Sequence, residues 1–196
     1  MTLGILEEIA AYQPFNEQEE RDKAVMLRLL SEKKDAFSRS SALAHMTASA
    51  WVVDASGTRV LMLYHNIYHS WSWAGGHADG DEDLLAVAIR EVREETGLRH
   101  LTCLCPGIFS LENLTVDGHE KRGVYVPSHI HCNVTYLLQA AEEPLREKPD
   151  ENSGVRWFTP EEALRASTEP WMVERIYRKL TEKSRRYMKM AETKAL

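Results

Sequence analysis

The stretch that decides the fold runs from Gly75 to Leu98 and reads GGHADGDEDLLAVAIREVREETGL. A glycine-rich loop leads into a segment that carries helix signals at both ends. Asp79 or Asp81 is suited to cap the first turn, and Gly97 is suited to end the last turn in a left-handed conformation. The stretch therefore predicts a helix over about residues 82–96.

Three acidic residues of this helix, Glu91, Glu94 and Glu95, lie side by side next to an apolar stripe. Residues three and four apart on a helix are neighbours, so their like charges repel. Clustered carboxylate oxygens are the ligands that a hard divalent cation such as Mg²⁺ prefers. The pattern indicates a metal site, and a solvated acidic face is the alternative.

The spacing of nine residues in this stretch resembles the Nudix box. These residues are Gly76, Glu82, Arg90, Glu91, Val92, Glu94, Glu95, Gly97 and Leu98. The resemblance implies an α+β protein with the Nudix α/β/α sandwich, in which a mixed β-sheet lies between helices. Extra helices are expected at the N- and C-termini.

The resemblance also implies roles for the box residues. Glu91, Glu94 and Glu95 are expected to bind Mg²⁺ or Mn²⁺, with the Gly76 carbonyl as a further ligand. Arg90 should hold one of the glutamates by a charge-assisted hydrogen bond and belongs with them to the catalytic set. The remaining box residues, Glu82 and Gly97, are expected to be structural. The proton acceptor is either a box glutamate or a later acid: Glu112, Asp117 or Glu120.

The implied function is hydrolysis of a diphosphate linkage by metal-activated water, the activity of a Nudix-type pyrophosphohydrolase. The substrate class is a nucleoside diphosphate derivative such as a nucleotide sugar, a dinucleotide or a nucleoside triphosphate. The alternative is a noncatalytic nucleotide-binding Nudix module that acts as a sensor or regulator. A third reading, an isomerase of allylic diphosphates, requires a catalytic cysteine that Cys103, Cys105 and Cys132 do not match by spacing.

Composition restricts the partners. The net charge of −6 argues against nucleic-acid binding, since phosphate backbones are held mainly by Lys and Arg. The sequence has no apolar run long enough for a membrane span and no leader pattern, so we expect a cytoplasmic protein without membrane attachment. The terminal helices offer surface for a homodimer. The three cysteines are expected to be reduced, structural thiols.

The 196 residues are expected to form a single Nudix domain. Its parts are a helical extension (1–40), a core (41–166) and a C-terminal helix (167–196). Helices are predicted over about 3–12, 16–30 and 170–191, with a shorter one from Thr159. Strands are predicted over 47–53, 59–64, 102–111, 129–140 and 154–158, and a long specificity loop over 112–128.

Five further residues are candidates for substrate contact. Trp71 and Trp73 precede the box and could stack on a base or sugar ring, although core packing explains them equally well. His77 directly follows Gly76. His129 and His131 lie on the polar side of the strand predicted over 129–140, so both should point the same way.

Overall fold

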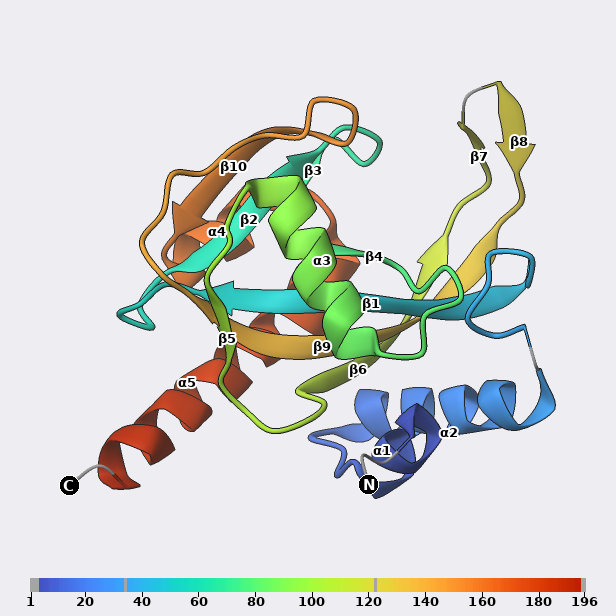
Figure 1. Cartoon of the computed structure of the whole chain (residues 1–196), viewed down its shortest axis with the longest axis horizontal. Coiled ribbons are helices and arrows are strands. Elements are labelled where there is room, and N and C mark those ends of the chain that lie inside the picture. Colours follow the sequence, from blue (N-terminus) through green and yellow to red (C-terminus); the bar gives the residue numbers. More distant parts are fainter. Residues whose placement is uncertain (1–3, 34, 122, 195–196) are drawn as a thin grey trace. The chain divides into compact units, whose positions relative to one another are not determined.

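The computed structural model of the chain describes residues 4–33, 35–121 and 123–194. In that part, eight strands form one mixed sheet with helices packed around it, as expected for the α/β/α class (Figure 1). Five strands follow the order β10-β2-β1-β9-β5, while β3 pairs with β2, β4 with β1 and β6 with β9. None of the helices described here is both long and apolar enough to cross a membrane.

The described residues group into two compact units, which are considered in turn. The first unit takes its residues from 1–49, 75–88 and 106–136, and the second from 50–74, 89–105 and 137–196. Three elements pass along the chain from the first unit into the second: β1 (Ala44–Val53), α3 (Leu84–Thr96) and β9 (His129–Ala140).

In the first unit, the N-terminal helices α1 (Ile5–Ala11) and α2 (Glu17–Glu32) confirm the helices expected at this end; residue 3 lies outside the described residues. Asn16 caps α2, because its side chain accepts a hydrogen bond from the Glu19 N–H. The buried Glu19 carboxylate also accepts hydrogen bonds from the Tyr12 hydroxyl and from the Ser110 hydroxyl on β6 (Ser110–Val116). The helical extension is thus bonded to a strand of the sheet, and Figure 1 shows α2 running beside β6.

β9 has the bounds that its alternating pattern predicts, His129–Ala140. Its first half pairs antiparallel with β6, from Ser110 opposite Thr135 to Val116 opposite His129. The single strand expected over 102–111 is wrong: the chain forms β5 (Leu101–Cys103) and β6, because Pro106 and the positive φ of Gly107 interrupt it.

The specificity loop expected over 112–128 is also largely structured. It contains the end of β6 and a hairpin of β7 (His119–Lys121) and β8 (Val124–Val126), which projects beyond β6 and β9 in Figure 1. The sequence hides this hairpin because Asp117, Glu120 and their polar neighbours resemble a loop, whereas residues 119–121 pair antiparallel with residues 124–126.

Helix α3 begins at Leu84, two residues later than expected. Neither Asp79 nor Asp81 caps it. Asp79 forms an ion pair with Arg39, while the Asp83 carboxylate accepts a hydrogen bond from the Ala86 N–H at 2.9 Å. Asp83 is therefore the cap, and the box loop is longer by one short turn. The helix ends as expected at Gly97, whose φ is +77°.

In the second unit, β2 (Val60–His65) pairs with β3 (Ser70–Ser72) and β10 (Asn152–Phe158). α4 (Pro160–Ala166) confirms the shorter helix expected from Thr159, and Thr159 and Glu162 form a capping box at its start. The C-terminal helical stretch consists of a π-helical segment, Met172–Tyr177, followed by α5 (Arg178–Lys194). Its buried Tyr177 lies against Trp51 and Trp73 and forms part of this unit's core.

β4 (Ala74–His77) lies against β1 with no room for a side chain at Gly75. A Cβ atom on Gly75 would stand 2.7 Å from the Ala48 carbonyl oxygen and 2.8 Å from the Ser49 Cα atom. Both are backbone atoms and cannot rotate away. The glycine is required for the approach of the two strands.

We expect Gly75→Ala to lower the free energy of unfolding by about 1–3 kcal/mol, the usual cost of overpacking, because β1 or β4 must move. Urea denaturation measures the change. Gly4→Ala is the control, since a Cβ atom there meets nothing within 4 Å. Equal stability of the two variants would show that the strands accommodate the methyl group.

Candidate functional site

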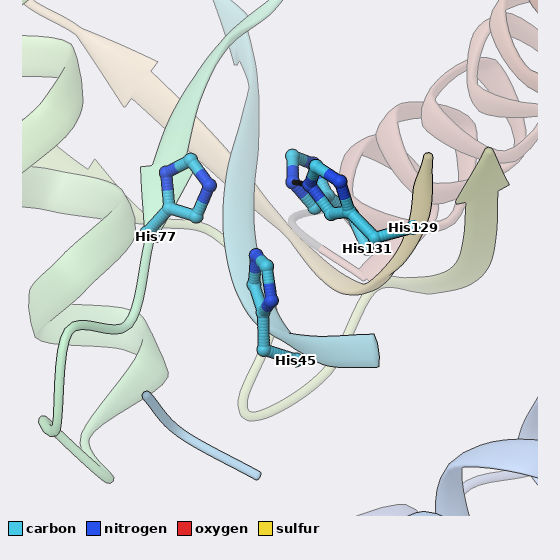
Figure 2. A group of neighbouring side chains, drawn as sticks. All are labelled: His45, His77, His129 and His131. Atoms are coloured by element: carbon cyan, nitrogen blue, oxygen red, sulfur yellow. Dashed lines mark hydrogen bonds between the residues drawn. The ribbon is translucent and has the colours of Figure 1, made fainter. Parts of the chain in front are cut away.

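Four histidines of the first unit converge from three strands. His45 comes from β1, His77 from β4, and His129 and His131 from β9. One ring nitrogen from each lies within 4.8 Å of the others, and Figure 2 shows the rings pointing toward one another. Among the described residues, no other set of three or more His, Cys, Asp or Glu side chains brings its ligand atoms together this closely.

Backbone carbonyl groups orient two of these rings. The His45 Nδ1 atom lies 3.1 Å from the Ser41 carbonyl oxygen, and the His129 Nδ1 atom lies 2.8 Å from the Pro127 carbonyl oxygen. A carbonyl only accepts, so in each ring Nδ1 carries the hydrogen and Nε2 presents a lone pair. The Nε2 atom of His45 is buried without a hydrogen-bond partner, and the Nε2 atom of His129 lies 3.0 Å from that of His131.

Burial favours the uncharged form of two of these rings, His131 and His45. Burial, assisted by the neighbouring His77, His45 and His129, lowers the pKa of His131 to about 2. Burial is also the main cause that lowers the pKa of His45, and Arg39 adds to it. Neutral imidazole is the form that accepts a hydrogen bond or binds a metal, so these rings do not serve as cationic anchors for phosphate.

The same faces of β1 and β9 continue into a buried polar network. Asn133 accepts hydrogen bonds from the hydroxyl groups of Thr47 at 3.0 Å and Ser49 at 2.9 Å. Its amide group donates to Glu112 at 3.1 Å, and the Thr135 hydroxyl donates to the same carboxylate oxygen at 2.7 Å. Glu112, one of the acids considered as a base, is fully buried within this network.

The box acids lie in the second unit, at the C-terminal end of α3. The Glu91 side chain is 15% exposed. Burial is the main cause that raises its pKa; the Arg90 guanidinium at 3.4 Å lowers the pKa and Glu94 raises it, with a net increase. Glu94 is about half exposed and lies 3.3 Å from the Lys148 ammonium group. Glu95 is nearly buried. The three carboxylates therefore lie on one helix end beside two cationic side chains.

A connecting segment before β10 supports this helix end. Lys148 also contacts Glu151 at 2.9 Å, and the buried Asn152 donates a hydrogen bond to the Glu95 backbone carbonyl at 2.9 Å. The side-chain amide oxygen of Asn152 in turn accepts a hydrogen bond from the Lys148 backbone N–H. Sequence reasoning missed Lys148 and Asn152, because nothing in the sequence indicates that residues 148–152 return to the end of the box helix.

The two tryptophans are part of the second unit's packing. Trp73 is 7% exposed and packs edge-on against Tyr177, and Trp71 packs against Phe158 with the ring centroids 4.9 Å apart. Their role in substrate stacking stays a prediction from the sequence. The same holds for the Gly76 carbonyl, which lies in β4, and for Glu82, which precedes α3.

The cysteines form no disulfide within the described residues. Cys132 is buried, and burial raises the pKa of its thiol to about 12, which makes it unreactive as a nucleophile. Burial also raises the pKa of Cys103 and Cys105. These environments give no support to an isomerase mechanism that relies on a thiolate.

His45 is a further functional candidate that sequence reasoning missed. The strand was expected to begin at residue 47, whereas β1 begins at Ala44 and includes it. A signal was present: His45, Thr47 and Ser49 alternate with apolar residues, so one side of the strand is polar along its first half.

The NUDIX domain family model matches residues 43–180, which is well over half of the sequence. The chain therefore belongs to the Nudix family, as the box predicts. It is an enzyme of the pyrophosphohydrolase class, and Nudix hydrolases generally use divalent cations.

Solved structures show the same fold. A NUDIX-family hydrolase from Clostridium perfringens is similar with a TM-score of 0.54 and 20% identity, over 72% of this chain and 96% of that one. A MutT protein from Methanosarcina mazei Go1 is similar with a TM-score of 0.50 and 20% identity, over 74% and 96%. No curated protein matches the sequence.

We expect Asn133→Leu to lower the free energy of unfolding by about 2–4 kcal/mol, because several buried polar groups lose their partner at once. Urea or thermal denaturation measures the loss. Asn66→Ala is the control, since its amide makes one exposed hydrogen bond, to the Pro149 carbonyl. If both variants are equally stable, water replaces the lost bonds and the network contributes little.

Proposed function

We propose that this protein hydrolyses the diphosphate linkage of a nucleoside diphosphate derivative: a nucleotide sugar, a dinucleotide or a nucleoside triphosphate. The observation that carries the proposal is the row of Glu91, Glu94 and Glu95 on the box helix of a Nudix-family chain. The burial of Cys132 and the raised pKa of all three thiols favour this reaction over the isomerase alternative.

The donor set of the box fits Mg²⁺ or Mn²⁺. It offers carboxylate oxygens only, and hard divalent cations prefer oxygen ligands. Glu91 and Glu95 are largely removed from solvent, so their charges repel more strongly than on an open helix face. When bound, such a cation neutralises phosphate charge and lowers the pKa of water.

The positively charged side chains of Arg90 and Lys148 position the box glutamates. Arg90 is bonded to Glu91 and holds this partly buried carboxylate next to the helix. Lys148 reaches Glu94 from the segment before β10 and leaves this carboxylate partly open to solvent. We assign Glu94 to the solvent side of the acidic row and Lys148 to its positioning, while Glu91 and Glu95 form the enclosed side.

We place the proton transfer on a box glutamate. The Glu112 carboxylate is fully buried and one of its oxygens already accepts two hydrogen bonds, so water does not reach it in this arrangement. Asp117 and Glu120 belong to the exposed β7–β8 hairpin region. A base must come within hydrogen-bond reach of the water that it activates.

The test is a screen of nucleotide sugars, dinucleotides and nucleoside triphosphates, with Mg²⁺ or Mn²⁺ present. We expect the wild-type enzyme to release phosphate or a nucleotide from at least one compound. Glu94→Gln and Glu95→Gln should each lower that rate by at least about a hundredfold, because each removes a charged ligand without changing side-chain size. Phosphate release and nucleotide chromatography measure the rates.

Glu142→Gln is the matched control, since this glutamate of the second unit is exposed. It should leave the rate within about twofold of wild type. Thermal denaturation of every variant separates loss of catalysis from loss of folding. Equal, slow rates for wild type and both box variants on every compound would contradict the proposal. Nucleotide binding without turnover in the presence of metal would support the noncatalytic module instead.

A further inference from the structure

We propose that His45, His77, His129 and His131 form a binding site for a transition-metal cation of the Zn²⁺ type, with a structural role in the first unit. The four side chains come from β1, β4 and β9, and their ring nitrogens already lie within 4.8 Å of one another. Imidazole nitrogen suits Zn²⁺ and its neighbours in the first transition row, while Mg²⁺ and Mn²⁺ favour oxygen. The site goes beyond the hydrolytic function and does not depend on it.

The first argument is the direction of the lone pairs. The Ser41 and Pro127 carbonyls fix the hydrogen on Nδ1 of His45 and His129, so the Nε2 lone pairs of both rings face the cluster. Metal-binding histidines commonly have this arrangement, in which a backbone carbonyl holds the ring nitrogen that does not bind. Two ligands of the site are thus already oriented.

The second argument is the unsatisfied Nε2 atom of His45. His45 is 4% exposed, and this nitrogen is buried with no hydrogen-bond partner. A buried polar atom without a partner is unfavourable, because it has lost its hydrogen bonds to water and gained none in exchange. A cation bound at the centre of the four rings supplies the missing partner.

The third argument is distance. Two nitrogens bound to one tetrahedral Zn²⁺ at about 2.0–2.1 Å lie about 3.3 Å apart. The Nε2 atoms of His129 and His131 are 3.0 Å apart, close to that spacing. The ring centroids of His45 and His77, and of His77 and His131, are 5.1 Å and 4.8 Å apart. Small rotations of the rings therefore bring all four nitrogens to one ion.

An anion is the competing ligand, and the geometry favours a cation. Converging lone pairs repel a phosphate oxygen and attract a positive charge. Arg39 is a cationic side chain that helps to lower the pKa of His45 and His131. Its guanidinium group donates hydrogen bonds to both carboxylate oxygens of Asp79. Its guanidinium group is thus already engaged by a carboxylate, the same kind of acceptor that a phosphate would offer.

A closed set of four protein ligands is typical of a structural site, since catalytic zinc keeps an open position. Here the ion would tie β4, which begins the Gly-Gly turn of the box, to β1 and β9. Binding to the folded protein alone should raise its melting temperature. The role is thus to hold three strands together within this unit.

The experiment uses the full-length protein, first freed of metal with a chelator and then kept in millimolar Mg²⁺, which occupies carboxylate sites without competing for imidazole. Zn²⁺ is titrated by calorimetry, and Co²⁺ is titrated by visible absorption, which reports a tetrahedral nitrogen environment. We expect one equivalent of either metal to bind and Zn²⁺ to raise the melting temperature by roughly 5 °C or more.

His131→Asn and His77→Ala should each weaken Zn²⁺ binding by about tenfold to a hundredfold or more, because one ligand is lost. His119→Ala is the control: this histidine belongs to the same unit, but its ring lies against the Asp117 carbonyl outside the cluster. It should bind like wild type. Since His131 is largely buried, circular dichroism of the variants checks folding, and the wild-type titration decides the question without any substitution.

Three results would overturn the proposal: no uptake of Zn²⁺ or Co²⁺ by the wild type, uptake that survives both substitutions, or stabilisation by inorganic phosphate in place of metal. The variant Glu94→Gln/Glu95→Gln separates this proposal from the hydrolytic one. It should lose activity and keep the Zn²⁺ site, whereas His131→Asn should lose the Zn²⁺ site.

Discussion

The close approach of β4 to β1 at Gly75 is the constraint on which much of the first unit depends. Because Gly75 has no side chain, the two backbones meet where any larger residue would strike the Ala48 carbonyl and the Ser49 Cα atom. This contact fixes the position of the next residues, Gly76 and His77, relative to His45 on β1. One glycine thus serves both the start of the box and the assembly of the histidines.

Next to this contact, β1 and β9 bury polar side chains that would be costly without partners. Thr47, Ser49, Asn133, Thr135 and Glu112 satisfy one another by hydrogen bonds. His45 follows the same row, but its Nε2 atom is not satisfied. The row therefore ends in a ring nitrogen without a hydrogen-bond partner, whereas the other polar side chains of the row are hydrogen-bonded. This contrast supports a ligand at the histidines.

The sequence predicted the parts that rest on local patterns. The box helix was placed to within two residues, β9 was placed at its actual bounds, and the caps of α2 and α4 follow from Asn16 and Thr159. It did not predict the break at Pro106 and Gly107, because apolar residues on either side suggested one continuous strand. The hairpin of β7 and β8 was missed because its strands are only three residues long and the first of them is polar.

The sites divide in the same way. Glu91, Glu94 and Glu95 are neighbours on one helix, so their proximity follows from helical periodicity alone. The partners Lys148 and Asn152 come from a segment more than fifty residues away, and only the folded chain shows them. Likewise, alternation places His129 and His131 on one side of β9, but their meeting with His45 and His77 depends on which strands pair.

The box glutamates and the four histidines offer different donor atoms, oxygen in one group and nitrogen in the other. This difference explains how the two proposed sites select different cations. Carboxylates offer negatively charged oxygen atoms, so they attract Mg²⁺ strongly enough to replace one or a few of its water ligands. Neutral imidazoles carry no charge, so they gain little from Mg²⁺ and bind those metals that form strong bonds to nitrogen. Burial strengthens the separation, since it disfavours the charged form of the His131 and His45 rings and leaves their nitrogen lone pairs available to a metal. The metal selectivity of the two sites would then follow from donor type and burial together. Neither site needs a geometry that fits only one ion.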